Sequence, residues 1–487
     1  MEYQSTRSKY TVSPQQAVLE GIAPDGGLYV CPKVSEYKID LEALMMLETY
    51  DVAAIILNAL LPGYDNMREM VEQAYTGKFD CEDIAPVAEL GVDYALELYH
   101  GPTLAFKDVA LSMLPHLMTN AKKQLGIDEK LVILTATSGD TGKAALEGFK
   151  DVEGTEICVF YPDGGVSAVQ QLQMITSQGR NVHCTAVVGN FDDCQTAVKE
   201  VFVKLKNDKD IRLTSANSIN IGRLAPQVVY YFLAYKQLVE TQRITLGDPI
   251  DFIVPTGNFG DILAGFYAKV MGLPVGTLVC ASNKNNVLTD FFKTGTYNKN
   301  REFFKTTSPS MDILVSSNLE RLLFHAADCD TDYVKGLMED LKSKGEFTVS
   351  DKIKERLNSI FYAAYADEDA VSKKIGEIFN KFGYVIDPHT AVGFVALDEY
   401  KKNRDNNNIC VVLSTASPYK FPAAVLKGLE KSTVADEFSM MDRLAFETKT
   451  EVPMAIQGIK YIPATHGGVI KKEELEDYIV GLFKEKR

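Results

Sequence analysis

The chain has 487 residues, of which 46% are hydrophobic and 24% charged, so it is too long for one ordinary domain and has the balance of a globular protein. Its 51 basic and 66 acidic residues give a formal net charge of −15, which argues against nucleic acid or an anionic membrane as partner because both are negatively charged. A small anionic substrate is still compatible with this charge, since a local cluster of donors can override the net field.

The predicted elements change in character along the chain. Residues 1–92 are mostly helical in pattern, without a repeat of strand and helix, which indicates a separate N-terminal domain. The following region alternates short β-rich apolar runs with helical patterns, which is typical of a parallel sheet in an α/β fold. Residues from about 284 to 386 are rich in helix and poor in strand. Strands are predicted at 130–136, 156–161, 181–188, 251–255, 277–282 and 408–413, and helices at 107–124, 141–150, 167–178, 192–206 and 219–239.

The first residues, Met1-Glu-Tyr-Gln-Ser-Thr-Arg-Ser, lack the apolar segment of a secretory signal. No uninterrupted apolar run reaches the ~20 residues that a membrane helix requires. The 8 cysteines are scattered singly, several of them inside apolar runs, as is typical of reduced thiols in a core. We therefore expect a cytoplasmic protein with no membrane partner and no nucleic-acid partner.

One lysine lies where a ligand of an α/β sheet is expected to bind. Such ligands bind at the carboxyl ends of strands, so the residues after each strand are the candidates. The segment His100-Gly-Pro-Thr-Leu-Ala-Phe-Lys-Asp108 places Lys107 at the start of an apolar helix, where a cation is unfavourable. The same field, with partial burial, would lower the lysine pKa and supply the neutral amine that a Schiff base requires. On this local pattern alone, a solvated surface lysine is the alternative.

Two further loops have the composition of anion cradles. The segment Thr137-Ser-Gly-Asp-Thr-Gly142 combines hydroxyls and glycines at a helix start, which suits a carboxylate or a phosphate. A plain helix N-cap is the alternative. The segment Pro255-Thr-Gly-Asn-Phe-Gly-Asp261 is a second candidate for phosphate, although it matches neither the Walker A loop nor the dinucleotide fingerprint. A tight strand–helix turn is the alternative there.

Three more polar turns precede helices. The hydroxyls of Leu413-Ser-Thr-Ala-Ser-Pro-Tyr-Lys-Phe421 could bond a neutral ring nitrogen, or simply cap a helix. In the segment Thr214-Ser-Ala-Asn-Ser-Ile-Asn-Ile-Gly-Arg223, the side chains of Asn217, Ser218, Asn220 and Arg223 could bind an oxyanion. In the turn at 387–393, His389 is as compatible with a structural cap as with a ligand or a base.

Taken together, these segments resemble the long form of the threonine synthase family. Matching segments occur in the order that the family has them and run over almost the full chain. They are Tyr3-Gln-Ser-Thr-Arg7, Ala17-Val-Leu-Glu-Gly-Ile-Ala-Pro-Asp-Gly-Gly-Leu-Tyr29, Gly101-Pro-Thr-Leu-Ala-Phe-Lys-Asp108, Ala136-Thr-Ser-Gly-Asp-Thr-Gly142, Ser215-Ala-Asn-Ser-Ile-Asn220, Pro255-Thr-Gly-Asn-Phe-Gly-Asp261 and Asp387-Pro-His-Thr-Ala391. The number of ordered matches makes a chance resemblance very improbable.

The resemblance implies an α/β fold of the fold-type-II pyridoxal-phosphate (PLP) enzymes, similar to tryptophan synthase β, with two doubly wound α/β domains and a helical N-terminal domain. The expected bounds are 1–92 for the N-terminal domain and 137–216 for a small domain that moves when substrate binds. The large PLP-binding domain would comprise 93–136 and 217–487, with the helix-rich region as an insertion.

The resemblance also implies roles for individual residues. Lys107 corresponds to the Schiff-base lysine, Asp140 to a contact of the cofactor's ring oxygen, and Thr415 to the partner of the pyridine nitrogen. The cofactor phosphate would bind to Thr256, Gly257, Asn258, Phe259, Gly260 and Asp261. The substrate carboxylate and phosphate would bind to Ser138, Thr141, Asn217, Ser218, Asn220 and Arg223.

The implied reaction converts O-phospho-L-homoserine and water to L-threonine and phosphate, by γ-elimination and addition of water at Cβ, in a monomer or homodimer without a metal. One position departs from the family, which usually has Thr-Ala-His-Pro where this chain has Thr415-Ala-Ser-Pro418. Because of Ser417, a phospho-lyase that releases 2-oxobutyrate, phosphate and ammonia is the alternative. A homologue that carries PLP without catalysis is a further alternative, but the intact Lys107 and both cradles argue against it.

Overall fold

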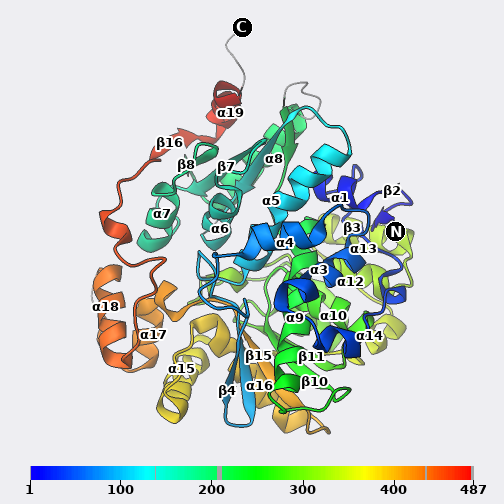
Figure 1. The fold of residues 1–487 in the computed structure, drawn as a ribbon, viewed down its shortest axis with the longest axis vertical. Coiled ribbons are helices and arrows are strands. Elements are labelled where there is room, and N and C mark those ends of the chain that lie inside the picture. Colours follow the sequence, from blue (N-terminus) through cyan, green and yellow to red (C-terminus); the bar gives the residue numbers. More distant parts are fainter. Residues whose placement is uncertain (1, 138, 206–210, 434–435, 484–487) are drawn as a thin grey trace.

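The computed structural model describes residues 2–137, 139–205, 211–433 and 436–483. The chain folds around two open sheets, one in the upper and one in the lower part of Figure 1, and the N-terminal region covers one side of the lower part. Among the described residues, no helix combines the length and the apolar character needed to cross a membrane.

The N-terminal region packs small elements against the large sheet's helices. Strand β1 (Tyr3–Ser5) pairs antiparallel with β2 (Thr11–Val12) and β3 (Tyr29–Val30). Helix α1 (Pro14–Glu20) begins where Ser13 accepts a bond from the Gln16 N–H and a proline occupies the first turn. The remaining helices here are α2 (Leu41–Met45), α3 (Thr49–Leu60) and α4 (Met67–Tyr75).

The larger sheet has six strands in the order β14-β11-β10-β15-β5-β4, all parallel except β4. Its central strands are buried on both faces, as parallel strands covered by helices are. Ile250, Phe252 and Val254 face the core that contains α9, whereas Ile253 faces the core that contains α16. The strands are β4 (Val87–Leu90), β5 (Asp93–Glu97), β10 (Ile250–Pro255), β11 (Val275–Ser282), β14 (Phe361–Tyr365) and β15 (Ile409–Ser414), and the main helices are α9 (Ile221–Glu240), α10 (Gly260–Val270), α15 (Glu368–Phe382) and α16 (Pro388–Asn403).

The smaller sheet has five parallel strands in the order β16-β8-β7-β6-β9. Helix α5 (Lys107–Gln124) lies between this unit and the large sheet and packs against both α6 and α9 (Figure 1). The strands are β6 (Lys130–Ala136), β7 (Thr155–Pro162), β8 (Val182–Val188), β9 (Ile211–Thr214) and β16 (Gly468–Lys471), and the helices are α6 (Asp140–Phe149), α7 (Ala168–Ile175), α8 (Phe191–Lys204) and α19 (Leu475–Phe483).

The pairing of strands differs from the expected domain bounds in three places. Strand β6, expected in the large domain, pairs with β7 and β9 of the small sheet. The C-terminal segment returns to the small sheet, where β16 pairs with β8 (Figure 1). Strand β4, expected in the N-terminal domain, pairs with β5 of the large sheet. These pairings join segments far apart in the chain, which the local sequence pattern does not report.

The region at 284–386 is rich in helix, as predicted, but it also contains a strand of the large sheet. Strand β14 pairs with β11 and forms the sheet edge, and β12 (Thr296–Asn298) pairs antiparallel with β13 (Glu346–Thr348) in a small two-stranded sheet. The helices of this region and of the C-terminal part are α11 (Val287–Thr294), α12 (Leu319–Ala326), α13 (Thr331–Ser343), α14 (Asp351–Asn358), α17 (Pro422–Gly428) and α18 (Glu437–Thr448).

Candidate active site

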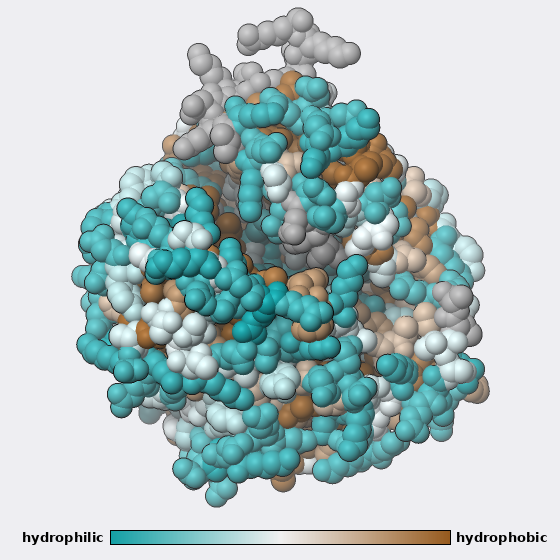
Figure 2. All heavy atoms as spheres, turned by 180° about the vertical axis from the view of Figure 1, so that it is seen from behind, coloured by the Kyte–Doolittle hydropathy of each residue, from teal (hydrophilic) through white to brown (hydrophobic). Residues whose placement is uncertain are grey.

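Loops from both sheets meet at the carboxyl ends of their strands. The loop after β5 and the loop after β15 are joined by backbone bonds from Phe106 N–H to Thr415 C=O (2.9 Å) and from Ser417 N–H to Leu104 C=O (3.0 Å). The loop after β6 reaches the same place through Asp140. Seen from behind, the surface is hollowed near the centre of the view, below the unit of the smaller sheet (Figure 2). The residues predicted after the strands are therefore close together in space.

The loop that precedes Lys107 is closed by the residue that follows it. The Asp108 carboxylate accepts bonds from the Thr103 N–H (2.8 Å) and the Thr103 hydroxyl (2.5 Å). A side chain at Gly101 would collide with Asp108, because its Cβ would lie 2.5 Å from the Asp108 Cβ. The spacing of Gly101, Thr103 and Asp108 thus shapes the turn that delivers Lys107 to the site.

The Lys107 side chain is buried in the site, with 12% of its surface exposed, so the surface-lysine alternative is wrong. Its Nζ lies 3.4 Å from the Ser310 hydroxyl and 3.8 Å from Oδ2 of Asp140. Burial lowers the pKa of Lys107; the negative charge of Asp140 opposes this shift, while the positive charges of Lys420 and Arg223 add to it. A buried lysine with a lowered pKa is suited to act as a nucleophile or a base.

Asp140, the first residue of α6, is bonded on both oxygens. Its Oδ1 accepts from Lys420 Nζ (2.7 Å) and Gln170 Nε2 (3.1 Å), and its Oδ2 from the Ser310 hydroxyl (3.4 Å). Burial alone would raise the pKa of this carboxyl, but the charges of Lys420 and Lys107 hold it well below its usual range. Asp140 is therefore ionised at neutral pH.

The turn from β10 to α10 forms a backbone anion cradle. A Cβ at Gly257 would lie 2.6 Å from the Ser310 carbonyl oxygen, and Phe259 adopts a left-handed conformation with φ of +65°. Within the described part of the chain, the backbone N–H groups of Gly257, Asn258 and Phe259 have no hydrogen-bond partner. Adjacent free N–H groups at a helix N-terminus are a favourable place for a phosphate.

The cradle is held from outside by polar side chains that the sequence pattern did not identify. The Ser316 hydroxyl donates to the Gly257 carbonyl (2.7 Å), and Asn318 Nδ2 donates to the Asn258 carbonyl (3.0 Å). Arg321 is fully buried, donates to Asn318 Oδ1, and also bonds the backbone carbonyl of Tyr29 (2.8 Å). A local signal was the presence of Arg321 among the leucines of α12, which begins directly after the N-cap Asn318.

Asp261 closes the cradle with a carboxyl group that binds protons unusually well. It lies in the first turn of α10 and is 5% exposed. Burial raises its pKa to about 7, although its own helix contributes a bond from the Ile262 N–H (2.9 Å). The group therefore titrates near neutral pH beside the predicted phosphate site.

The predicted loop after β15 contains one hydroxyl without a partner and one hydroxyl that caps a helix. Thr415 is buried, and its hydroxyl has no hydrogen-bond partner among the described residues. The Ser417 hydroxyl accepts from the Tyr419 N–H (3.4 Å) and caps a short 3-10 helix at Pro418–Lys420. The structure thus separates a hydroxyl that is available to a ligand from one that is used by the backbone.

The start of α9 combines a fully bonded asparagine at the N-cap with an incompletely bonded arginine in the first turn. Asn220 caps α9 through a bond from the Gly222 N–H (2.8 Å) and donates to the carbonyls of Val18 (2.9 Å) and Ser215 (3.2 Å). Arg223 is 3% exposed and donates to a single backbone carbonyl, while its Nε has no partner among the described residues. Burial lowers the pKa of Arg223 to about 10, and no carboxylate of the described chain pairs with it. Arg223 is thus available as a hydrogen-bond donor to an anion, whereas the hydrogen bonds of Asn220 hold the backbone in place.

The other predicted substrate ligands are less defined. Thr141 is partly exposed in the first turn of α6. Asn217 bonds the Ser215 hydroxyl through its N–H (3.2 Å), and the Ser218 carbonyl accepts from Asn318 (3.2 Å). Ser138 lies outside the described residues.

His389 supports the site indirectly, through Ser310. Its Nδ1 bonds Asp387 (2.6 Å), which caps α16, and its Nε2 accepts from the Ser310 N–H (3.2 Å). Ser310 in turn contacts both Lys107 and Asp140 through its hydroxyl. The sequence alone did not single out Ser310, because it belongs to a loop without a recognisable pattern.

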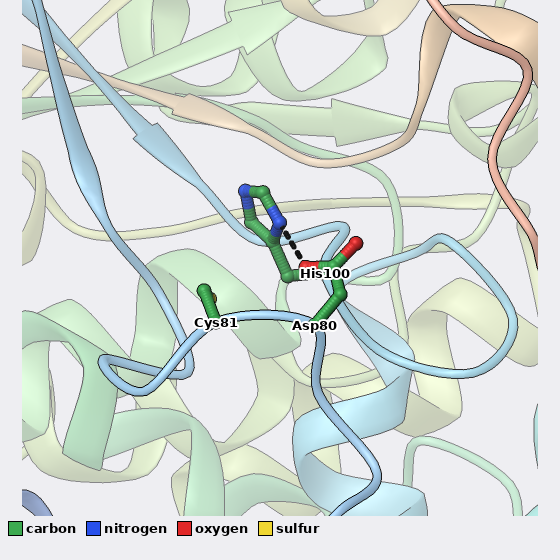
Figure 3. A group of neighbouring side chains, drawn as sticks. All are labelled: Asp80, Cys81 and His100. Carbon is green, nitrogen blue, oxygen red and sulfur yellow. Dashed lines mark hydrogen bonds and ion pairs between the residues drawn. The ribbon is translucent and has the colours of Figure 1, made fainter.

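A second polar group anchors the start of the Lys107 loop. Figure 3 shows the imidazole of His100 beside Asp80 and Cys81. Its Nδ1 bonds Asp80 (2.5 Å) and its Nε2 bonds Glu97 (2.8 Å). Burial would lower the pKa of His100, but these two carboxylates raise it. Since both ring nitrogens are engaged, this group acts as a doubly paired histidine that ties residues 80 and 97 to the loop.

Two open α/β sheets whose loops meet around a buried lysine are the arrangement of the fold-type-II PLP enzymes, and this chain belongs to that class. The family model described as "Pyridoxal-phosphate dependent enzyme" matches residues 81–415, and pyridoxal phosphate is the cofactor of this chain. Two further models, "Threonine synthase N terminus" and "Threonine synthase, C-terminal", match residues 2–75 and 390–461. The chain belongs to the threonine synthase family.

Individual relatives agree with this assignment. The threonine synthase of Pseudomonas aeruginosa is 37% identical over 96% of this chain and 99% of that protein. The PLP-bound threonine synthase of Brucella melitensis, 37% identical, superposes with a TM-score of 0.88 over 100% of both chains. The yeast enzyme, 32% identical, gives 0.87 over 98% of each. The human protein Threonine synthase-like 1 is 41% identical over 85% of this chain, which spans only 58% of that relative.

Proposed function

We propose that this protein converts O-phospho-L-homoserine and water to L-threonine and phosphate. The observation that carries the proposal is that the buried amine of Lys107 shares its site with two sets of unpaired N–H donors, each able to bind an anion. The N–H groups of Gly257, Asn258 and Phe259 suit the cofactor phosphate, and the Arg223 guanidinium suits an anionic group of the substrate. O-phospho-L-homoserine offers such a group at each end, a carboxylate and a phosphate.

The residues fit the cofactor as well as the substrate. Lys107 would carry PLP, the turn from Thr256 to Asp261, which includes Gly260, would hold its phosphate, and Thr415 would bond its ring nitrogen through the free hydroxyl. Asp140, ionised beside Lys107, would face the ring oxygen. When bound, PLP supplies an electron sink for negative charge at the carbon that bears the substrate amine.

The chain itself would position the substrate and move protons. The Lys107 amine removes the proton from Cα and returns protons later, which its lowered pKa favours. Arg223, Thr141, Ser138 and the segment at 217–220 would bind the substrate's anionic groups. Closure of the smaller-sheet unit over the substrate would exclude all water but the molecule that adds at Cβ. We place this reaction in the cytoplasm and in a monomer or homodimer.

A phospho-lyase is the second candidate, and the residue at position 417 favours it. Ser417 replaces the histidine usual in the family and is used as a cap, so it offers no general acid or base. Such an enzyme would release phosphate, 2-oxobutyrate and ammonia, and it would consume one water just as the synthase does.

The experiment that separates the two candidates is to identify the products formed from O-phospho-L-homoserine. We expect phosphate and L-threonine in equal amounts. Phosphate with equal amounts of 2-oxobutyrate and ammonia would replace the synthase by the lyase, and the Ser417→His variant would then show whether the histidine restores threonine. Absence of phosphate release from enzyme that has its visible PLP absorbance would contradict both candidates.

A further inference from the structure

A second lysine is buried in the site, beside Lys107. Lys420 ends the short helix Pro418–Lys420, and only 1% of its side chain is exposed. Its Nζ donates to the Thr103 carbonyl (2.7 Å) and to Oδ1 of Asp140 (2.7 Å). A lysine so deeply buried is unfavourable unless it is paired, and this one pairs with the same carboxylate that faces Lys107.

One carboxylate therefore serves two lysines, and it serves them unequally. Asp140 contacts Lys420 at 2.7 Å but Lys107 at 3.8 Å, so Lys420 has the closer counter-ion. Gln170 fixes the orientation of Asp140 by bonding the same oxygen that Lys420 bonds (3.1 Å). Because the two lysines compete for one negative charge, the lysine with the longer contact is the one that loses its proton more readily.

The other groups around Lys107 do not supply it with a full negative counter-charge. Arg223 from α9 adds a second positive charge, and Asp261 from α10 adds a carboxyl whose burial raises its pKa to about 7. Ser310 offers a neutral hydroxyl, and the ring of Phe106 lies 4.9 Å from Nζ without adding a charge. His389 contacts Ser310, since its Nε2 accepts from the Ser310 N–H (3.2 Å) while its Nδ1 bonds Asp387 (2.6 Å).

We propose that Lys420 is a positioning residue, which holds Asp140 by its near oxygen and leaves the Lys107 amine without a full counter-ion, free to react with PLP. The inference rests on the proposed role of Lys107 but not on which products the enzyme releases. Lys420 also connects three segments that build the site, because its two partners belong to the Lys107 loop and to α6 of the smaller-sheet unit. A purely structural lysine would need only its hydrogen bonds, whereas the proposed role needs its charge.

The charge can be separated from the hydrogen bonds by substitution. Lys420→Gln keeps a donor of similar reach and removes the charge, whereas Lys420→Arg keeps the charge. Lys427→Gln is the matched control, because Lys427 is an exposed lysine of the neighbouring α17. For each holoenzyme, the visible PLP absorbance is titrated with pH, and the rate at which the apoenzyme takes up PLP is measured at neutral pH.

We expect Lys420→Gln to raise the midpoint of the titration by about one unit, because Asp140 then pairs with Lys107 alone. The uptake of PLP at neutral pH should slow by about tenfold, which is the loss of free amine that one pH unit represents. Lys420→Arg should stay close to the parent enzyme, and Lys427→Gln should match it. A folded Lys420→Gln enzyme with the parental midpoint would overturn the proposal, as would equal shifts in the Gln and Arg variants.

Asp140→Asn tests the same charge balance with the opposite sign, and it decides the matter even if Lys420→Gln does not fold. With the carboxylate removed, the charge of Lys420 acts on Lys107 uncompensated, so the midpoint should fall below that of the parent enzyme. An unchanged or raised midpoint would contradict the proposal. These titrations do not involve the substrate, so an enzyme that proved to be a phospho-lyase would leave their outcome unaffected.

Discussion

The two anion-binding regions of the site differ in how completely the protein bonds them. Around the cradle at 256–261, buried side chains bond the outward carbonyls, so the backbone is fixed before any ligand arrives. On the other side, Arg223 keeps a buried donor without a partner. Both regions have unpaired donors, but a cradle whose backbone is already held suits a group that stays, such as a cofactor, whereas a single side-chain donor suits a group that comes and goes.

The largest effect should follow from removing the amine that both regions share. Lys107→Ala should lower turnover of O-phospho-L-homoserine by about 10³-fold or more, because it removes the group that moves protons. The loss should include the visible absorbance of bound PLP. Lys122→Ala, at the opposite end of α5, is the control and should retain both. Substantial turnover in Lys107→Ala would show that the Lys107 amine is not the group that moves protons.

Two buried arginines offer a direct test of the difference between the regions. Arg223→Met should raise KM for O-phospho-L-homoserine by about 30-fold, the equivalent of a charge-assisted hydrogen bond worth ~2 kcal/mol. Its thermal stability should be unchanged or higher, since the variant removes a buried and incompletely paired charge. Steady-state kinetics and thermal melts report the two quantities separately.

Arg321→Met is the matched substitution on the fixed side and should behave in the opposite way. Its guanidinium bonds Asn318, Tyr29 and Ile219, so its loss leaves buried acceptors unpaired and should destabilise the fold by about 3 kcal/mol. We expect a lower melting temperature and weaker PLP retention, with KM affected less than in Arg223→Met. If both variants lost stability equally, the distinction between a fixed and an open region would be wrong.

Much of this site could be predicted because its key residues follow strands. The strand at 130–136 and the helix at 107–124 agree with the structure, and the loops that follow the strands meet as expected. Ser310 could not be predicted, since its contacts to Lys107 and Asp140 span more than a hundred residues of chain. Lys420 could have been found, because it lies just ahead of α17, where a cation is as unfavourable as at Lys107.

Pairing between distant strands was the part of the fold that local patterns did not contain. Strand β16 joins the smaller sheet at β8 although nearly three hundred residues separate them in the chain. Strand β14 is a short apolar run of 5 residues inside a helix-rich region, so its pattern did not stand out. The sequence alone therefore indicated the kind of fold and the site loops better than the domain bounds.

The two glycines of the cradle, Gly257 and Gly260, differ in the space around them. Gly257→Ala should weaken PLP binding by about tenfold and also lower stability, because its Cβ would lie 2.6 Å from the Ser310 carbonyl oxygen. Gly260→Ala meets no protein atom closer than 3.6 Å, so it should fold normally. A loss of PLP binding in Gly260→Ala without a loss of stability would show that the open side of the turn faces the cofactor. Equilibrium PLP titration and thermal melts of each apoenzyme provide the measurements.

The smallest effect should come from Asp261, and it appears in the pH dependence of stability. Its pKa is raised by burial from 3.8 to about 7, so the native state favours the protonated form. The corresponding stabilisation is fully present below the unfolded pKa and is lost as the pH rises through about 7. Thermal melts of the holoenzyme from pH 5 to 8 should therefore decline less steeply for Asp261→Asn than for the parent enzyme. The exposed Asp442→Asn should follow the parent curve, and a parental slope in Asp261→Asn would mean that this carboxyl is already ionised beside the cradle.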